Sequence, residues 1–134
     1  MLASGAMADP QILVLLPAWN EEEALPAVLA ELHALKAYPD LLVVDDGSTD
    51  RTSEVAKASG ATVLTLPINL GVGGALRAGY RWALRNGFTH VVRVDSDGQH
   101  DPSDVARVLG PVLAGESDLC IGARFAGVGE YGQK

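Results

Sequence analysis

The chain has 134 residues, of which 48% are hydrophobic and 20% charged, and this balance predicts one folded domain with a packed core rather than a disordered chain. Its ten basic and seventeen acidic residues give a formal net charge of −7, which argues against the basic surface that binds nucleic acids. The single cysteine, Cys120, excludes an internal disulfide and a cysteine-rich zinc site.

The N-terminal segment lacks the positive charge and the long apolar core of a secretion signal, and we expect residues 1–10 to be disordered or derived from cloning. No apolar run approaches the roughly 20 residues of a transmembrane helix. The expected location is therefore the cytoplasm, with attachment to the cytoplasmic face of a membrane only through a further C-terminal part.

Five short apolar runs, several of them rich in valine, predict strands. They are Ile12–Leu16, Leu41–Val44, Thr62–Leu66, His90–Val94 and Leu119–Ile121. Apolar residues occupy successive positions in these runs instead of alternating ones. The strands should therefore be covered on both faces, as in a parallel sheet.

Segments with helical periodicity lie between these runs and predict four helices. The first carries Leu25, Val28, Leu29, Leu32 and Leu35 behind an acidic first turn of Glu21, Glu22 and Glu23. The second follows the cap candidates Ser48, Thr49 and Asp50 and ends near Gly60. The third runs from about Gly74 to Asn86, and the fourth begins at the N-cap Asp101 with Pro102 in its first turn. This alternation predicts an α/β fold with right-handed crossovers.

Polar or small residues follow the carboxyl end of every predicted strand. The segments read PAWNEEE, DDGSTD, NLGVGG, DSDGQHD and GAR. Ligands of open α/β sheets bind outside the carboxyl ends of the strands. The five segments therefore predict a single binding site at one edge of the sheet.

The segment after the fourth strand predicts a metal site. Asp95, Asp97 and Gln99 alternate in a turn opened by Gly98, and their oxygens suit Mg²⁺ or Mn²⁺, which take further ligands from water and substrate phosphates. The spacing does not fit an EF-hand, which needs glycine where His100 stands. The alternative is structural: Asp95 caps a turn and Asp97 is solvated. His100 is either a ligand, a substrate contact or an ordinary loop residue.

The other segments leave alternatives open. Asp45 or Asp46 could accept hydrogen bonds from a base or a ribose, and Trp19 could stack on a flat ring or belong to the core. The glycines of NLGVGG match neither common phosphate-binding motif and favour close packing of a helix start against the sheet. Arg77 and Arg124 are the basic residues best placed to meet phosphate, although Arg77 also suits an exposed surface.

Taken in this order, the motifs resemble those of family 2 glycosyltransferases, most closely the branch that makes polyprenyl-phosphate sugars. LLPAWNEEEAL is similar to the family's opening motif, with Trp19 where tyrosine is usual, and VVDDGSTDRT to its second motif. NLGVGGALRAGYRWA, DSDGQHDP and GARF resemble its later motifs, the second of these being the D-x-D metal motif. The resemblance covers about residues 11–125.

The resemblance implies a GT-A fold, which is a Rossmann-like three-layer α/β/α arrangement with a mainly parallel sheet. It implies a nucleotide-sugar-binding domain over residues 11–125 and a tail over residues 126–134, with the chain cut before the acceptor region. The implied activity is metal-dependent, inverting transfer of a sugar from a GDP- or UDP-linked donor to a polyprenyl phosphate or a glycan.

The resemblance also implies roles for individual residues. The nucleotide would lie against Pro17, Trp19, Glu21, Asp46 and Asp95. Mg²⁺ or Mn²⁺ would be held by Asp95, Asp97 and Gln99. Arg124 would lie toward the phosphates or the acceptor, and no catalytic base can be named in this chain.

Three other functions compete with this interpretation. A nucleotidyltransferase would need a glycine- and lysine-rich segment after the first strand, where this chain has PAWNEEE. A receiver-like signalling module would need an aspartate after the third strand and a lysine after the fifth, where NLGVGG and GARF stand. A non-catalytic nucleotide-binding remnant of the same fold is not separated by sequence from an enzyme. Donor base, sugar, acceptor and oligomeric state stay open.

Overall fold

A computed structural model describes residues 9–98 together with residues 105, 107 and 110. The elements of this part are, in chain order, β1 (Ile12–Ala18), α1 (Leu25–Leu35), β2 (Leu41–Asp45), α2 (Thr52–Ala58), β3 (Thr62–Thr65), α3 (Val72–Arg85) and β4 (His90–Arg93). Every strand pair is parallel, and the order across the sheet is β3-β2-β1-β4. The α/β prediction is therefore confirmed.

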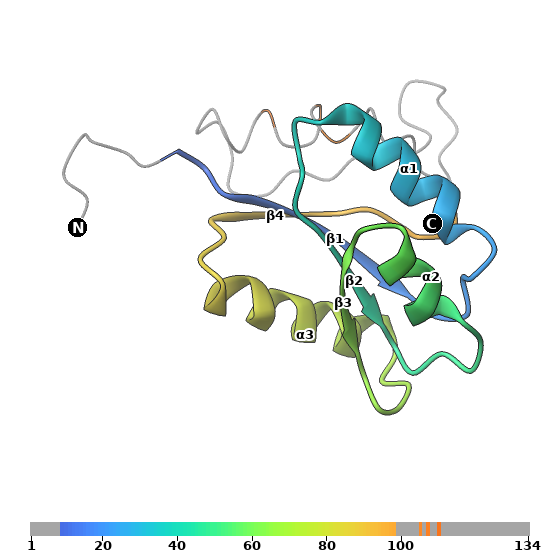
Figure 1. Cartoon of the computed structure of the whole chain (residues 1–134). Coiled ribbons are helices and arrows are strands. Elements are labelled where there is room, and N and C mark those ends of the chain that lie inside the picture. The colour runs from blue at the N-terminus through green and yellow to red at the C-terminus, as the bar shows by residue number, and fades with distance from the viewer. Residues whose placement is uncertain (1–8, 99–104, 106, 108–109, 111–134) are drawn as a thin grey trace, which may run out of the picture.

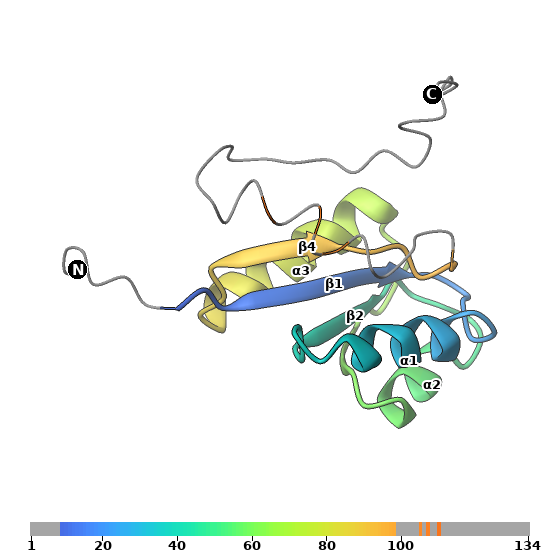
Figure 2. The same cartoon turned by 90° about the horizontal axis from the view of Figure 1, so that it is seen from above.

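Helices cover both faces of the sheet, which gives the predicted three layers (Figures 1 and 2). One face of β1, including Val14 and Leu16, packs with Leu29 of α1 and Ala56 of α2. The other face, including Leu13 and Leu15, packs with buried residues of α3. Burial on both faces explains why β1 and β2 appear in the sequence as unbroken apolar runs.

Four strands and three helices match the predicted segments to within a few residues. One local expectation is wrong: α1 begins at Leu25, so Glu21, Glu22 and Glu23 precede the helix and do not form its first turn. Of the fourth predicted helix, residues 105, 107 and 110 are described and helical. Its start at Asp101, the strand Leu119–Ile121 and Cys120 lie outside the described residues.

Helix α3 lies close against the sheet because it carries a glycine at the contact. A Cβ added to Gly79 would lie 2.6 Å from the side chain of Leu15 on β1. Gly71 has a φ of +89° at the N-cap of α3, and neither Gly71 nor Gly73 has sheet atoms within 4 Å of the place of a Cβ. Close packing of this helix thus depends on Gly79, not on these two glycines of NLGVGG.

The strand order places a change of direction beside β1. The chain moves from β1 through β2 to β3, and then returns to place β4 on the other side of β1. A right-handed crossover that reverses direction puts its helix on the opposite face, as α3 is here. Such a change leaves a crevice between the carboxyl ends of β1 and β4, and α/β proteins bind ligands at crevices of this kind. Among the helices of the described part, none is both long and apolar enough to cross a bilayer.

Candidate nucleotide- and metal-binding site

A cavity of about 420 Å³ lies at this crevice. Residues that follow the carboxyl ends of β1, β2, β3 and β4 line it, with the start of α3 at one side. The lining residues are Pro17, Ala18, Trp19, Glu21, Asp46, Asn69, Gly71, Val72, Ala75, Arg93, Asp95, Ser96 and Asp97. Four of the five polar segments singled out in the sequence thus meet at one place.

Most of the predicted site residues lie at this cavity. Pro17, Trp19, Glu21, Asp46, Asp95 and Asp97 line it. Trp19 is 51% exposed, so it is not a core residue and its ring is available to a ligand. Gln99, His100 and Arg124 lie outside the described residues, and Arg77 is exposed on α3 without lining the cavity.

The loop after β4 is held by the serine between its two aspartates. Ser96 is 4% exposed, and its hydroxyl donates to the backbone carbonyl of Pro17 at 3.0 Å. The backbone N–H of Val94 donates to the carbonyl of Leu15 at 3.0 Å. These bonds fix the loop against β1, and Asp95 and Asp97 are positioned at the cavity by the serine between them.

Arg93 is a lining residue that the sequence analysis did not single out. It is the last residue of β4, and its Nη2 lies 3.2 Å from Oδ1 of Asp95. The signal available in the sequence was a lone arginine inside an apolar strand, two positions before a predicted metal ligand. Residues two apart on a strand point to the same side, so this spacing could have placed the guanidinium at the site.

The two adjacent aspartates after β2 have different surroundings. Both oxygens of Asp46 accept backbone hydrogen bonds, from Leu70 at 2.7 Å and from Gly71 at 2.9 Å. Asp45 instead accepts from the N–H of Ser48 at 3.0 Å and from the hydroxyl of Ser53 at 2.5 Å. Of the two, only Asp46 lines the cavity. The backbone of the glycine-rich segment thus binds a carboxylate of the protein at these two N–H groups.

Gly47 permits this contact between the second and third loops. Its φ is +72°, and a Cβ there would lie 2.5 Å from the backbone of both Ile68 and Asn69. No side chain fits so close to a neighbouring backbone, and the conformation is one that glycine adopts readily. Glycine at this position therefore lets Asp46 reach the start of α3.

Asn20 joins the first loop to the second. Its backbone N–H donates to the hydroxyl of Ser48 at 2.8 Å, and its side-chain oxygen accepts from the N–H groups of Thr49 at 2.8 Å and Asp50 at 3.3 Å. Its φ of +53° is a left-handed conformation that asparagine tolerates better than most residues. Ser48 and Thr49 were predicted as cap candidates, but the bonds that they form with Asn20 join the two loops instead.

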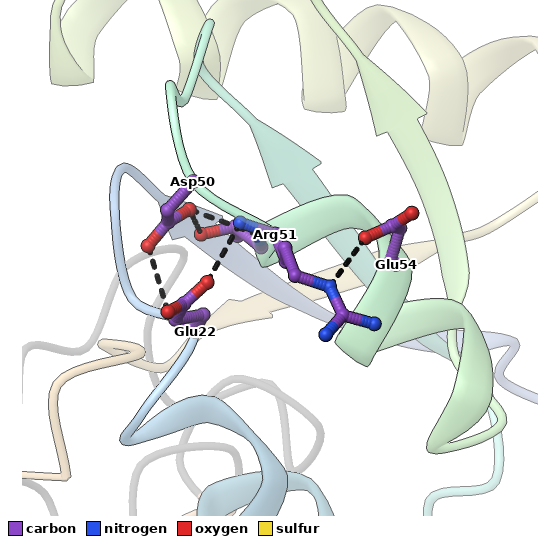
Figure 3. A network of polar contacts seen from close by, with 5 residues as sticks. Glu22, Asp50, Arg51 and Glu54 are labelled. Carbon is purple, nitrogen blue, oxygen red and sulfur yellow. Dashed lines mark hydrogen bonds and ion pairs between the residues drawn. The ribbon is translucent and has the colours of Figure 1, made fainter.

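Two further bonds join Glu22 to Asp50 and to Arg51 (Figure 3). The N–H of Glu22 donates to Asp50 at 3.3 Å, and the N–H of Arg51 donates to the Glu22 carboxylate at 2.8 Å. Asp50 also accepts from the N–H of Thr52 at 2.9 Å, so it acts at the start of α2 as predicted. Burial alone would raise the pKa of Asp50, but hydrogen bonds from Thr52 and Glu22 lower it.

The pKa of Glu21 is affected by the negative charge of the cavity. Partial burial, together with the charges of Asp97 and Asp50, raises the pKa of its carboxyl. Its backbone is fixed by a 2.9 Å bond from its N–H to the Thr52 hydroxyl. The repulsion among these carboxylates would be relieved by a bound cation.

The described residues fit a divalent ion that takes some of its ligands from the protein and the others from a substrate. No group of three His, Cys, Asp or Glu side chains suited to a metal occurs among the residues that the structure describes. Asp95 and Asp97 nevertheless offer two carboxylates at an open cavity. Mg²⁺ is commonly held by one or two carboxylates plus substrate phosphates, so two such ligands suffice for this kind of site.

Comparison with known proteins identifies similar sequences. The family model for Glycosyl transferase family 2 matches residues 13–134. Polyprenol monophosphomannose synthase of Mycolicibacterium smegmatis is 37% identical, and the match covers 90% of this chain and 50% of that protein. Undecaprenyl-phosphate mannosyltransferase of Micrococcus luteus is 39% identical, with 85% of this chain and 48% of that protein covered. The chain thus spans about half the length of these relatives.

Solved structures show the same fold. Glucosyl-3-phosphoglycerate synthase from Mycobacterium tuberculosis in complex with Mn²⁺, UDP and glucosyl-3-phosphoglycerate matches with a TM-score of 0.65 and 34% identity. The match covers 80% of this chain and 41% of that one. Its complex with UDP alone matches with a TM-score of 0.67 and 36% identity. Parallel sheet, helix layers and family model agree, and the chain belongs to glycosyl transferase family 2 with a GT-A fold.

Proposed function

We propose that this chain forms the donor-binding part of a metal-dependent, inverting glycosyltransferase that uses a nucleotide-diphospho-sugar. The observation that carries the proposal is the cavity between the ends of β1 and β4, where Asp95 and Asp97 lie with the exposed ring of Trp19. The two carboxylates can hold a metal that binds a diphosphate, and the ring can stack on a base. The complex of the M. tuberculosis relative with Mn²⁺ and UDP supports this choice.

In the proposed site, Trp19 stacks on the base while Pro17 and Glu21 border the nucleoside. Asp46 faces the base with the lone pairs that Leu70 and Gly71 do not use, since a carboxylate has about four acceptor positions. Asp95 and Asp97, with Gln99, hold Mg²⁺ or Mn²⁺, and Asp95 also borders the nucleotide. Residues 11–125 are the proposed nucleotide-sugar-binding domain, with Arg124 toward the phosphates or the acceptor.

The proposed reaction breaks the bond between the anomeric carbon and the diphosphate, and the electron pair leaves with the nucleoside diphosphate. A divalent ion stabilises the charge of this leaving group. An acceptor oxygen attacks the opposite face and forms the new bond, which inverts the configuration. The polyprenol monophosphomannose synthase and the undecaprenyl-phosphate mannosyltransferase support a polyprenyl phosphate as acceptor. Such a phosphate oxygen is already ionised near neutral pH and needs no base. The proposed place of the reaction is the cytoplasmic face of a membrane.

The test is calorimetric titration of UDP and of GDP into the chain, each with Mn²⁺ and with EDTA. We expect one nucleotide to bind only with Mn²⁺, and Asp97→Ala to weaken that binding by at least about tenfold, as expected when a charged ligand contact is lost. Glu31→Ala removes an exposed carboxylate from α1 and should bind like the wild type. Binding that survives in EDTA, or that is unchanged in Asp97→Ala, would overturn the metal-dependent site.

A further inference from the structure

We infer that Arg93 exchanges partners when donor binds: it pairs with Asp95 in the free protein and with the donor diphosphate in the complex. The inference rests on the proposed function and adds a residue that determines phosphate binding. It assigns this role to a position inside β4, outside the motifs that carry the family resemblance.

The position of Arg93 follows from strand alternation. Val92 packs in the core on the side of α1 and α2, whereas Val91 packs against the core on the side of α3. Arg93 lies two residues beyond Val91 and therefore points to the α3 side. It pairs there in register with Leu15, and it lines the cavity together with Ala75 of α3. Arg93 thus lies at the crevice between β1 and β4, with its side chain partly exposed.

The cavity is lined by more acidic than basic residues, so a basic residue is needed there to bind an anionic diphosphate. Glu21, Asp46, Asp95 and Asp97 line the cavity, and Arg93 is the single basic residue among the described residues that do so. The charge of a divalent ion held by Asp95 and Asp97 is formally cancelled by their two carboxylates. The negative charge of a diphosphate then remains to be met by the protein, and Arg93 is the described residue placed to meet it.

The same geometry makes Arg93 easy to release. Its Nη2 lies 3.2 Å from Asp95, and the side chains are 43% and 31% exposed, so the pair is weak. Metal ligation draws Asp95 away from the guanidinium. A guanidinium presents a fork of N–H donors that matches two phosphate oxygens, which makes the phosphate the stronger partner.

The test distinguishes partner exchange from a purely structural role by the direction in which the Mn²⁺ affinity changes when Arg93 is replaced. In the first measurement, Mn²⁺ alone is titrated into the protein, and the electron paramagnetic resonance signal of free Mn²⁺ gives the amount bound. If Arg93 competes for Asp95, Arg93→Met should bind Mn²⁺ as tightly as the wild type or more tightly. If Arg93 only holds Asp95 in place, Arg93→Met should bind Mn²⁺ more weakly, and the inference is overturned.

The second measurement is binding of the nucleoside diphosphate, UDP or GDP, that the wild type accepts at saturating Mn²⁺. We expect Arg93→Met to weaken it by about tenfold or more, the scale of one charge-assisted hydrogen bond, and Arg93→Lys to restore part of the loss. Binding of the nucleoside without phosphates should not change. Equal diphosphate affinity in Arg93→Met and wild type would overturn the inference.

Arg81→Met is the matched control, because Arg81 is exposed on α3 and does not line the cavity. It removes the same charge and should change neither measurement. Circular dichroism establishes that each variant is folded. If the wild type binds neither UDP nor GDP with Mn²⁺, the proposed function fails, whereas normal wild-type binding that Arg93→Met leaves intact refutes only the role of Arg93.

Discussion

The hydroxyl of Ser96 donates a hydrogen bond to the backbone carbonyl of Pro17 at 3.0 Å, with Ser96 almost fully buried. The bond joins the loop after β4 to the end of β1, and these two strands lie on either side of the crevice. Asp95 and Asp97 flank Ser96 and line the cavity. The acidic loop is therefore held against the end of β1 by an uncharged residue.

Ser96→Ala should weaken Mn²⁺ binding several-fold, because Asp95 and Asp97 lose the bond that positions their loop. It should also lower the free energy of unfolding by about 1 kcal/mol, because the partly buried Pro17 carbonyl loses this donor. The measurements are urea denaturation and titration of Mn²⁺. Ser53→Ala is the matched control, since its hydroxyl bonds Asp45 and Thr65 and does not reach the cavity. It should lower stability comparably and leave Mn²⁺ binding unchanged. Equal loss of Mn²⁺ affinity in both variants would contradict this role.

Asp46→Asn should destabilise the protein more than Asp45→Asn, although both aspartates are buried. The asparagine amide at position 46 would direct its own N–H toward the N–H of Leu70 or Gly71, which leaves a buried donor unpaired at a cost of about 1–3 kcal/mol. At position 45 the amide can donate to the hydroxyl of Ser53 while its oxygen still accepts from Ser48. Urea denaturation of the two variants measures the difference. Equal losses of stability would show that the bonds from Leu70 and Gly71 to Asp46 contribute no more than the bonds to Asp45.

Gly47→Ala should cost at least about 3 kcal/mol, because it combines a positive φ with a Cβ placed 2.5 Å from the backbone of Ile68 and Asn69. Gly73→Ala is the comparison. Gly73 lies in the first turn of α3 with no atom within 4 Å of the new Cβ, so this change should be neutral or stabilising by up to about 1 kcal/mol. Thermal denaturation of both variants distinguishes them. A mild effect of Gly47→Ala would mean that the second and third loops can separate.

The fold could be predicted because burial on both faces leaves a direct trace in the sequence. Leu13 to Leu16 are all buried, and so are the residues of β2, so their apolar runs identified central strands. The start of α1 could not be predicted in the same way. Glutamates favour a helix N-terminus locally, but the N–H of Glu21 donates to Thr52 at the start of α2, and the N–H of Glu22 donates to Asp50 in the loop before that helix. A tertiary contact overrode the local preference.

The position of the site in the fold could be predicted more readily than the contacts of its residues. The rule for strand ends brought Trp19, Asp46 and Asp95 together without any knowledge of distances. Residue spacing did not separate Asp45 from Asp46, and only the family resemblance implied Asp46, because their difference lies in which backbone approaches each carboxylate. Arg93 was not predicted because it belongs to the apolar run of β4 and to none of the polar segments, although its two-residue spacing to Asp95 places both on one side of the strand.

Asp50 should stabilise the protein at neutral pH and lose this effect in acid. Its pKa is lowered from an ordinary value of 3.8, so the folded state binds the proton less tightly than the unfolded state. Its contribution is complete above the unfolded pKa and disappears as pH falls through the lower folded pKa. Asp50→Ala should therefore cost about 1 kcal/mol or more at pH 7, and the gap to the wild type should narrow below about pH 4. Urea denaturation at a series of pH values measures this gap, and a gap independent of pH would contradict it.

Glu21→Gln should have the opposite pH dependence, because burial and the charges of Asp97 and Asp50 raise the pKa of Glu21 above 4.5. The folded state binds this proton more tightly, so the ionised carboxylate is destabilising once pH rises through the folded pKa. The variant should be more stable than the wild type at pH 7, by about 0.5 kcal/mol, and the gain should vanish near pH 4.

Mn²⁺ supplies the decisive comparison for Glu21. A cation at Asp97 offsets the repulsion that the ionised Glu21 experiences, so saturating Mn²⁺ should raise the melting temperature of the wild type more than that of Glu21→Gln. Glu23→Gln, an exposed neighbour that does not line the cavity, should match the wild type with and without Mn²⁺. If Mn²⁺ raises the melting temperatures of Glu21→Gln and Glu23→Gln equally, then the charge of Glu21 does not interact with the bound metal. If only Glu21→Gln differs, the carboxylates of the first and fourth loops act on the same bound cation.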